Sequence, residues 1–246
     1  MDAFDGALGR TVGMVIDGDQ VDDASVDLID VVDPSSEVVV ARVPAAGPEH
    51  VARALESTAR GFAAWRAQTG WERSAILRTM AEAIRRDADE LARIVTAEQG
   101  KPTAQALGEV RATADQFDWC ADEARRIYGR VVPAQAAGDR ILVLREPIGP
   151  ILAFAPWNFP MLLPGRKVAA ALAAGCSILV VAPVEAPLSS LALARIGLEA
   201  GLPPGALNVL TGHPADLAEA LIDSPVIRKV SVTSSVPVGV RTMARA

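Results

Sequence analysis

The sequence predicts an α/β protein in which a parallel sheet, with helices on both faces, follows a small β entry and three helices. Two observations carry this prediction. From Pro150 onward, short β-branched runs alternate with helical stretches that end in Gly, as in consecutive βαβ units. Between residues 48 and 127, three amphipathic stretches place their apolar residues at helical spacing.

The β entry is expected from short apolar runs near the start of the chain. They are separated by Gly18-Asp19 and by Asp33-Pro34-Ser35-Ser36, which are typical turn sequences. Consecutive strands joined by such turns predict a meander. The expected strands are Met14–Ile16, Leu28–Val32 and Glu37–Val43.

Three helices should follow the entry. The first begins at Pro48, because Pro is favoured in a first helical turn. The second runs over about 72–99 and stops at Gly100-Lys101-Pro102, a Gly cap followed by Pro. The third carries the apolar residues between Val110 and Ile127.

The segment after these helices has the composition of a hairpin with a flexible tip. Val131-Val132 and Ile141–Leu144 flank a small, Ala- and Gly-rich stretch. A protruding hairpin suits assembly, because its edges offer unpaired backbone groups to a partner. The predicted parts of the chain are a β/helical part at 1–128, the hairpin at 129–149 and the parallel layer at 150–246.

The parallel layer should contain four strands, each followed by a helix. Gly175 and Gly201 end the first two of these helices. The expected strands are the apolar run from Ile151 to Pro156, then Ser177–Val181, Ala206–Leu210 and Lys229–Val232; the expected helices are Leu163–Ala174, Leu188–Ala200, Pro214–Ile222 and Pro237–Ala246.

Composition and charge exclude several classes of function. A net charge of −6 argues against nucleic-acid binding, and no apolar stretch reaches the length of a membrane span. Two cysteines, Cys120 and Cys176, make neither a disulfide framework nor a metal-ligand spacing, and His50 and His213 are isolated. The start of the chain is acidic and lacks the features of a signal peptide. We therefore expect a cytoplasmic protein without a metal site.

The stretch Ile151–Pro160 is the first candidate for function. Its apolar half is typical of a buried parallel strand, and its second half places one amide, Asn158, between two aromatic residues. Open α/β sheets bind ligands at the carboxyl ends of their strands, where this amide would lie. An ordinary strand-to-helix loop with a surface Asn explains the stretch equally well.

Two further candidates follow other predicted strands. Glu185 comes just after a strand, where a carboxylate can accept ribose hydroxyls; the alternative is a surface acid near a helix start. The turn at Thr233–Gly239 follows a strand and opens a helix, so its amides can meet an anion. A Ser N-cap with Pro in the first turn explains this turn almost as well.

Five motifs, in order and at matching spacings, closely resemble the aldehyde dehydrogenase superfamily. The resemblance covers the chain from about Asp27 onward. The motifs are Glu98-Gln99-Gly100-Lys101-Pro102, Pro156-Trp157-Asn158-Phe159-Pro160, Lys167–Cys176, Glu199–Gly205 and Ser235-Val236-Pro237-Val238-Gly239.

The resemblance implies a Rossmann-like sheet, NAD(P)-dependent oxidation of an aldehyde to a carboxylic acid, and an oligomerisation role for the hairpin. In the family, a Cys thiolate attacks the aldehyde, hydride passes to the cofactor, and a Glu base assists thioester hydrolysis. By resemblance, Asn158 donates its amide to the developing oxyanion. The residues implied at the cofactor are Phe154, Ala155, Pro156, Trp157, Ala182, Glu185, Gly212, Ser234, Ser235 and Val238.

This sequence departs from the family pattern in three ways. The family's general-base Glu and nucleophilic Cys come later than Ala246, so the resemblance implies an N-terminal half without the catalytic domain. The Lys that usually precedes Pro183 is Ala182 here. The family's Thr-Gly-Ser is Thr233-Ser234-Ser235, which puts a Cβ where Gly permits close approach. We therefore expect weak NAD binding, with NADP less favoured because of Glu185.

Three interpretations follow from these departures. The chain is inactive alone, or it is one chain of a split enzyme completed by a partner, or it is a non-catalytic nucleotide-binding or assembly module. The apolar faces left bare by a missing half favour a homo-oligomer or a complementing chain.

Overall fold

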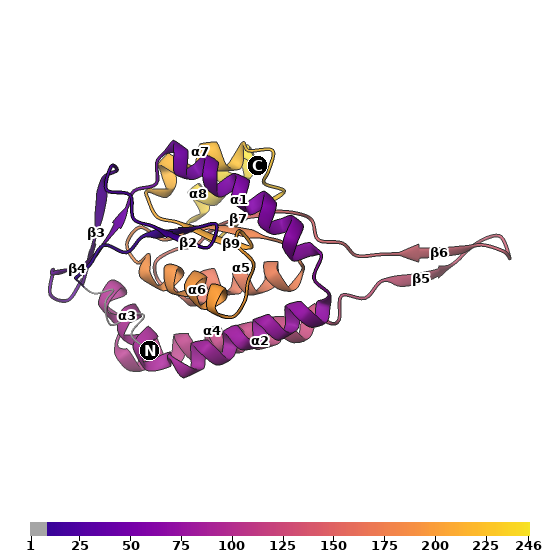
Figure 1. Ribbon diagram of the computed structural model, residues 1–246, viewed down its shortest axis with the longest axis horizontal. Coiled ribbons are helices and arrows are strands. Elements are labelled where there is room, and N and C mark those ends of the chain that lie inside the picture. Colours follow the sequence, from indigo (N-terminus) through magenta and orange to yellow (C-terminus); the bar gives the residue numbers. More distant parts are fainter. Residues whose placement is uncertain (1–8) are drawn as a thin grey trace.

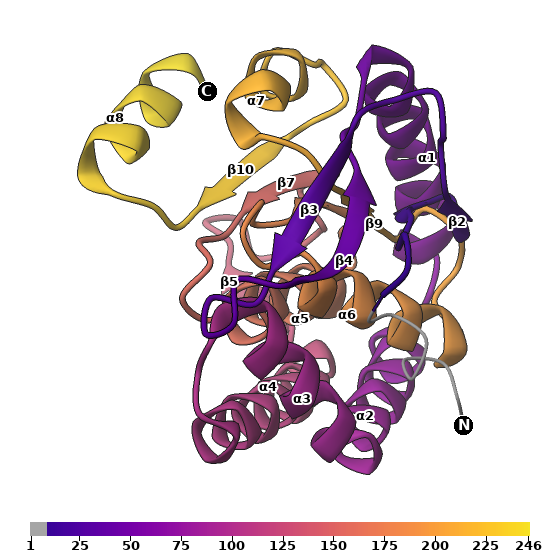
Figure 2. The same ribbon diagram turned by 90° about the vertical axis from the view of Figure 1, so that its left-hand side faces the viewer.

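The computed structural model describes residues 9–246 and shows helices and sheet in four layers, from which a long hairpin protrudes (Figures 1 and 2). Residues 1–8 of the predicted 1–128 part lie outside the described residues. Within 9–246, none of the helices is both long and apolar enough to cross a membrane.

A six-stranded sheet lies at the centre, in the order β10-β7-β8-β9-β1-β2. The four strands of the βα alternation pair in parallel, which confirms the predicted sheet. The strands are β1 (Met14–Ile16), β2 (Asp19–Val21), β7 (Ile151–Phe154), β8 (Ile178–Val181), β9 (Leu207–Leu210) and β10 (Lys229–Val232).

The predicted meander is wrong, because the β entry divides between two sheets. β1 pairs antiparallel with β9 and β2 extends that edge, whereas β3 (Leu28–Val32) and β4 (Val39–Pro44) form a separate pair. All three residues of β1 are buried, because β1 lies in the central sheet, which helices cover on both faces. β2 is a polar edge strand without an apolar run, so its sequence carries no strand signal.

Helices cover both faces of the sheet, as predicted. Along β7 and β8, alternate side chains point to opposite faces, so Ile151 and Val180 join one core while Leu152 and Leu179 join the other. On the first face lie α5 (Leu162–Ala173) and α6 (Leu188–Glu199); on the second lie α1 (Pro48–Arg66) and α7 (Pro214–Ile222); α8 (Val236–Arg245) follows β10 (Figure 1).

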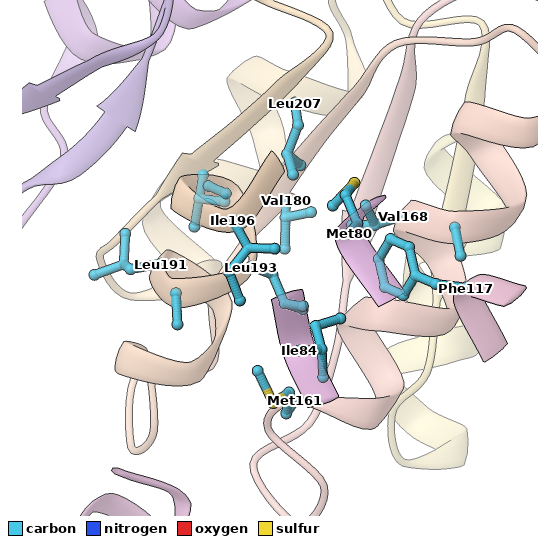
Figure 3. Close-up of a cluster of buried hydrophobic side chains, with 14 of the residues drawn as sticks. Met80, Ile84, Phe117, Met161, Val168, Val180, Leu191, Leu193, Ile196 and Leu207 are labelled. Carbon is cyan, nitrogen blue, oxygen red and sulfur yellow. The ribbon is translucent and has the colours of Figure 1, made fainter. Parts of the chain in front are cut away.

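The outer layer contains one helix more than predicted. The expected helix over 72–99 is interrupted at Asp87, whose ψ of 18° leaves the helical range. After the break, α3 packs on β3 as well as on α4 and α6, whereas α2 packs on α4, α5 and α6. The helices are α2 (Gly70–Arg86), α3 (Ala88–Gln99) and α4 (Thr103–Ala124). Their apolar faces meet α5 and α6 in a continuous core around Met80, Phe117 and Leu193 (Figure 3).

The predicted hairpin is present as β5 (Arg130–Pro133) and β6 (Arg140–Val143), in antiparallel register. It extends well beyond the body of the protein (Figure 1). Val131 and Leu142 are cross-strand partners, and both are exposed.

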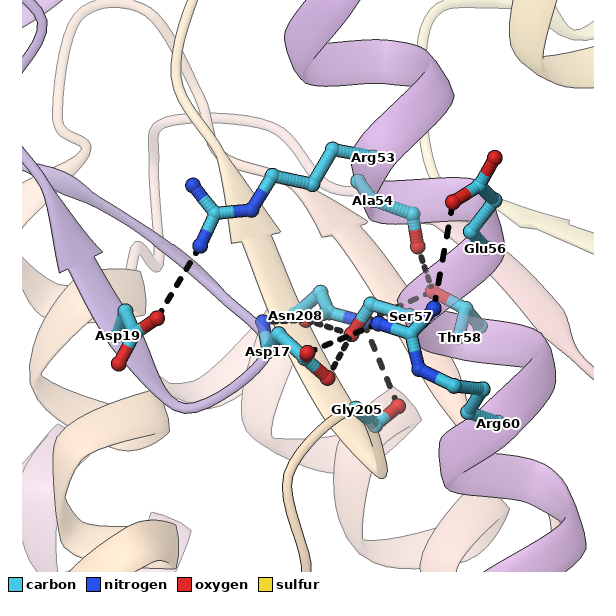
Figure 4. A network of polar contacts seen from close by, with 10 residues as sticks. All are labelled: Asp17, Asp19, Arg53, Ala54, Glu56, Ser57, Thr58, Arg60, Gly205 and Asn208. Atoms are coloured by element: carbon cyan, nitrogen blue, oxygen red, sulfur yellow. Dashed lines mark hydrogen bonds and ion pairs between the residues drawn. The ribbon is translucent and has the colours of Figure 1, made fainter.

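A buried polar network fixes α1 against β9 and the turn after β1 (Figure 4). The Asn208 amide donates to Thr58 Oγ1 at 2.8 Å and to the Gly205 carbonyl, while its oxygen accepts from the Asp17 amide at 2.9 Å. The backbones approach so closely here that a Cβ at Gly205 would lie 2.2 Å from the Ser57 carbonyl oxygen. This contact explains the glycine.

Two buried carboxylates hold the starts of the inner helices, neither of which has a side-chain cap of its own. Glu98 Oε2 accepts from the Leu188 amide at 2.6 Å, and Oε1 accepts from the Ser189 amide at 2.9 Å and from its hydroxyl. Glu109 Oε1 accepts from the Met161 and Leu162 amides at 2.9 and 3.1 Å. Each carboxylate therefore satisfies first-turn amides at the positive end of a helix dipole.

Burial raises the pKa of Glu98 to about 7 and outweighs the hydrogen bonds from Ser189 and Leu188, which lower it. The ordinary value is 4.5, so the folded protein binds more protons than the unfolded chain between these limits. The contribution of this group to the free energy of unfolding should be full below pH 4.5 and be lost as the pH rises to about 7.

Urea unfolding at a series of pH values checks this expectation. Glu98→Gln should lower the free energy of unfolding, because its NH₂ group would face a backbone N–H that needs an acceptor. It should also remove this part of the pH dependence, because an amide does not titrate. Glu82→Gln, at an exposed position of α2, should retain the wild-type profile. Equal pH dependence in all three proteins would show that Glu98 titrates normally.

Candidate functional site

The carboxyl ends of the four parallel strands lie side by side at one edge of the sheet. Phe154 at the end of β7 pairs with Val232 of β10 and Val181 of β8, and Val181 pairs with Leu210 of β9. The chain builds β7, β8 and β9 in one direction and then places β10 on the other side of β7. This reversal is a topological switch point, where open α/β sheets bind ligands.

The loop after β7 carries the first set of predicted residues. Phe154, Ala155 and Pro156 are half-buried, and Trp157 and Asn158 are exposed. The Thr233 amide donates to the Phe154 carbonyl at 3.1 Å, so the loops after β7 and β10 are joined where they leave the sheet. Among the described residues, the Asn158 side-chain amide makes no hydrogen bond and is open to solvent.

The turn after β10 leads into α8 with Ser235 at the N-cap position and Pro in the first turn. The Ser235 side chain makes no capping hydrogen bond, and Ser234, Ser235 and Val238 are exposed. The first-turn amides of α8 therefore point to an open surface, which suits an anionic group. Ion pairs of Arg245 with Asp223 and Glu219 hold the far end of α8 to α7.

The loops after β8 and β9 complete the edge. Ala182 is fully buried and donates its amide to the Leu210 carbonyl at 2.9 Å, whereas Glu185 is exposed in the following bend. Gly212 is buried at φ 143°, and a Cβ there would lie 3.3 Å from the Ala46 amide nitrogen. Local packing thus accounts for this glycine, and its contact with a cofactor stays a prediction.

Neither cysteine lies at this edge. Cys120 is buried in α4, and burial raises the pKa of its thiol. Cys176 is buried just before β8, at the amino end of the strand. The described residues therefore present no thiol beside Asn158, and no group of three or more metal-ligating side chains gathers among them.

Sequence reasoning missed two features, one at the loop after β7 and one toward the amino ends of the strands. Lys101, from the turn between α3 and α4, donates to the Asn158 carbonyl at 3.0 Å across 57 positions of sequence. A pocket of about 460 Å³ runs along α5 and reaches the amino ends of β7 and β10, with Glu146 as well as Arg166, Lys167 and Lys229 in its lining. Lys167 Nζ donates to Ser231 Oγ at 3.0 Å, and burial lowers its pKa. The hydrogen bonds of Lys101 and Lys167 could not be predicted from sequence spacing, because each joins two elements that are far apart in the chain.

The edge has the groups that a dinucleotide requires. The uncapped start of α8 suits a pyrophosphate, Glu185 is an exposed acceptor after the second parallel strand, and the half-buried loop after β7 offers an apolar surface. Ser234 fits less well, because its side chain stands in the turn that an anion would approach. An anion at this turn would meet a less open approach than Gly would provide.

Comparison with known proteins agrees with this geometry. The family model described as the aldehyde dehydrogenase family matches residues 21–246. The chain is 38% identical to an Escherichia coli succinate-semialdehyde dehydrogenase [NADP(+)], over 93% of this chain and 48% of that protein. It is 40% identical to a Pseudomonas putida 3-sulfolactaldehyde dehydrogenase, over 91% of this chain and 46% of that protein.

Solved structures give the same result. An aldehyde dehydrogenase from Bacillus cereus in complex with NAD+ superposes with a TM-score of 0.95 at 28% identity, over 100% of this chain and 50% of that one. The chain spans about half the length of the curated relatives it matches, as the resemblance to an N-terminal half implied. On the fold, the family model and these relatives together, the chain belongs to the aldehyde dehydrogenase family.

Proposed function

We propose that this chain forms the dinucleotide-binding part of an NAD(P)-dependent aldehyde dehydrogenase and supplies Asn158 as an oxyanion donor. The observation that carries the proposal is the convergence of four loops at the edge where the strand order reverses. When bound, the nicotinamide ring accepts hydride from the substrate. The chain's own residues bind, orient and shield it.

Each loop has a distinct part in this proposal. The start of α8, with Ser234, Ser235 and Val238, meets the pyrophosphate, and Glu185 accepts hydrogen bonds from the adenosine ribose. The residues of the β7 loop from Phe154 to Trp157 line the cleft, together with Ala182 and Gly212. Because Glu185 would repel a 2′-phosphate, NAD is preferred over NADP. Ala182 offers no cation to either cofactor, so binding is weak.

These 246 residues alone do not oxidise aldehydes in this proposal. The reaction class needs a nucleophile next to the oxyanion donor, and both cysteines are buried away from Asn158. A complementing polypeptide that brings a Cys and a general base to the edge would restore the reaction. Without such a polypeptide, the chain is a nucleotide-binding and assembly module.

The proposed substrate is an aldehyde that carries a second, anionic group. The names of the two curated relatives described above specify succinate semialdehyde and 3-sulfolactaldehyde. Each of these molecules has a carboxylate or sulfonate besides its aldehyde.

The hairpin β5–β6 is the proposed assembly element. It stands away from the body and carries a run of exposed apolar side chains, which a single copy leaves in water. A second copy of the chain, or the complementing polypeptide, would cover them. The exposed apolar residues are Val131, Ile141, Leu142, Val143 and Leu144.

Cofactor binding is tested by calorimetric titration of the chain with NAD+ and NADP+. NAD+ should bind more tightly, and Glu185→Gln should weaken NAD+ binding by about tenfold, the value of one hydrogen bond to a charged acceptor. Glu82→Gln, on the distant helix α2, should bind as the wild type does. Tighter binding of NADP+ than of NAD+ by the wild type would refute the role of Glu185.

Turnover is tested with exhaustively purified chain, succinate semialdehyde and NAD+. The chain alone should give no reduced cofactor, and activity should appear only in a mixture with a co-purifying polypeptide. That mixture should prefer succinate semialdehyde over butanal, which has the same carbon number but no anion. Turnover by the purified chain alone, or equal activity with both aldehydes, would contradict the proposal.

Assembly is tested by light scattering on the double variant Val131→Lys, Leu142→Glu. The two positions are cross-strand partners, so opposite charges preserve the hairpin while removing its apolar surface. The wild type should be larger than its 25.7 kDa monomer, and the variant should be monomeric. Val38→Lys, at another exposed apolar position, should leave the size unchanged. A monomeric wild type would exclude self-association through the hairpin.

A further inference from the structure

The ammonium of Lys101 makes three contacts at one point. Its Nζ lies 2.5 Å from Glu109 Oε2, 3.0 Å from the carbonyl oxygen of Asn158, and 3.9 Å from the centroid of the Phe159 ring. The Lys101 side chain is only 9% exposed. A lysine is rarely buried to this extent unless it is paired, and these three contacts hold its ammonium in place.

Glu109 extends the same network to the other side of Pro160. While Oε2 faces Lys101, Oε1 accepts from the Met161 and Leu162 amides at the start of α5. The Glu109 side chain is 1% exposed. The pair therefore holds the backbone on both sides of Pro160, at Asn158 through the ammonium and at 161–162 through the carboxylate.

The turn that carries Lys101 is itself closely packed. Lys101 lies between Gly100, which ends α3 at φ 79°, and Pro102, which precedes α4. A Cβ at Gly100 would lie 2.6 Å from Pro34 Cγ, so the turn packs closely against the segment after β3. Lys101 thus links the turn between the outer helices α3 and α4 to the loop after β7.

The contact is made to the backbone of Asn158 and leaves its side chain open. Hydrogen bonding at the carbonyl restricts the peptide plane, and the amide group of Asn158 remains exposed and without a partner among the described residues. An oxyanion donor acts by preorganisation, and a displacement of about 1 Å at such a group costs orders of magnitude in rate.

We propose that Lys101, held by Glu109, is a positioning residue that fixes the backbone at Asn158 and so aims its side-chain amide out of the sheet edge. The inference rests on the proposed function for the role of Asn158. A role in stability alone explains the network less well. Replacing a buried ion pair by apolar residues is often neutral or stabilising, so the pair is better explained by the geometry it imposes.

The test is ¹⁵N relaxation of the backbone at residues 157–159 and of the Asn158 side-chain amide in the full chain. In the wild type these groups should be as ordered as α5, with order parameters of about 0.85. Lys101→Met should lower them below about 0.6, because the stem remains but the charge and donors are lost. Lys101→Arg should restore them, since it keeps a charge and donors.

Two controls separate positioning from general stability. Arg111→Met removes a cation from an exposed position of α4 and should leave the order parameters unchanged. Phe159→Leu keeps Lys101 and removes only the ring on its ammonium, so it should loosen the loop less than Lys101→Met does. This variant and the wild-type measurement keep the proposal testable if Lys101→Met fails to fold.

A mobile Asn158 in the wild type, or unchanged order in a folded Lys101→Met chain, would overturn the proposal. The same holds if Lys101→Met lowers order equally throughout α4 and α5. These outcomes do not depend on NAD binding. A loop that loosens as expected in a chain that binds neither NAD+ nor NADP+ would leave the positioning role intact and refute only the proposed function.

Discussion

The pairing of β7 with β10 on one side and β8 on the other is the constraint on which the site depends. In-register parallel pairs bring the ends of these strands to one edge, so the loops after Phe154, Val181 and Val232 start side by side. The hydrogen bond from Thr233 to the Phe154 carbonyl joins two of those loops directly. Without the reversal of strand order at this point, the loops after β7 and β10 would be separated by the width of the sheet.

The loops gain their order from buried groups outside the sheet. Glu98 accepts from the start of α6, just after the bend that carries Glu185, and Glu109 accepts from the start of α5, just after Asn158. Both carboxylates come from the neighbourhood of the turn at Gly100. Desolvation of two carboxylates is costly, and the raised pKa of Glu98 reflects that cost. The outer layer of helices therefore supports two of the four loops that form the proposed site, those after β7 and β8.

Much of this fold follows from local pattern. The βα alternation predicts α7 and β10 to the residue, because Pro214 marks the start of α7 and the alternating Lys-Val-Ser-Val at 229–232 marks β10. Prediction from the sequence pattern fails where tertiary contacts determine the local structure. The break at Asp87 depends on the different partners of α2 and α3, and β2 exists only because the sheet offers its polar residues an edge. The candidate residues after the strands were identifiable from their positions, whereas the contact of Lys101 with Asn158 joins elements far apart in sequence.

The central claim is that one edge of this chain is built to bind a dinucleotide. Mapping of backbone amide chemical shifts during titration of the chain with NAD+ tests it most directly. We expect the perturbed amides to lie in four loops, at 154–158, 182–185, 211–212 and 233–239, with the helices α2 to α4 unaffected. Saturable changes confined to other surfaces, or no change at millimolar NAD+, would contradict the claim.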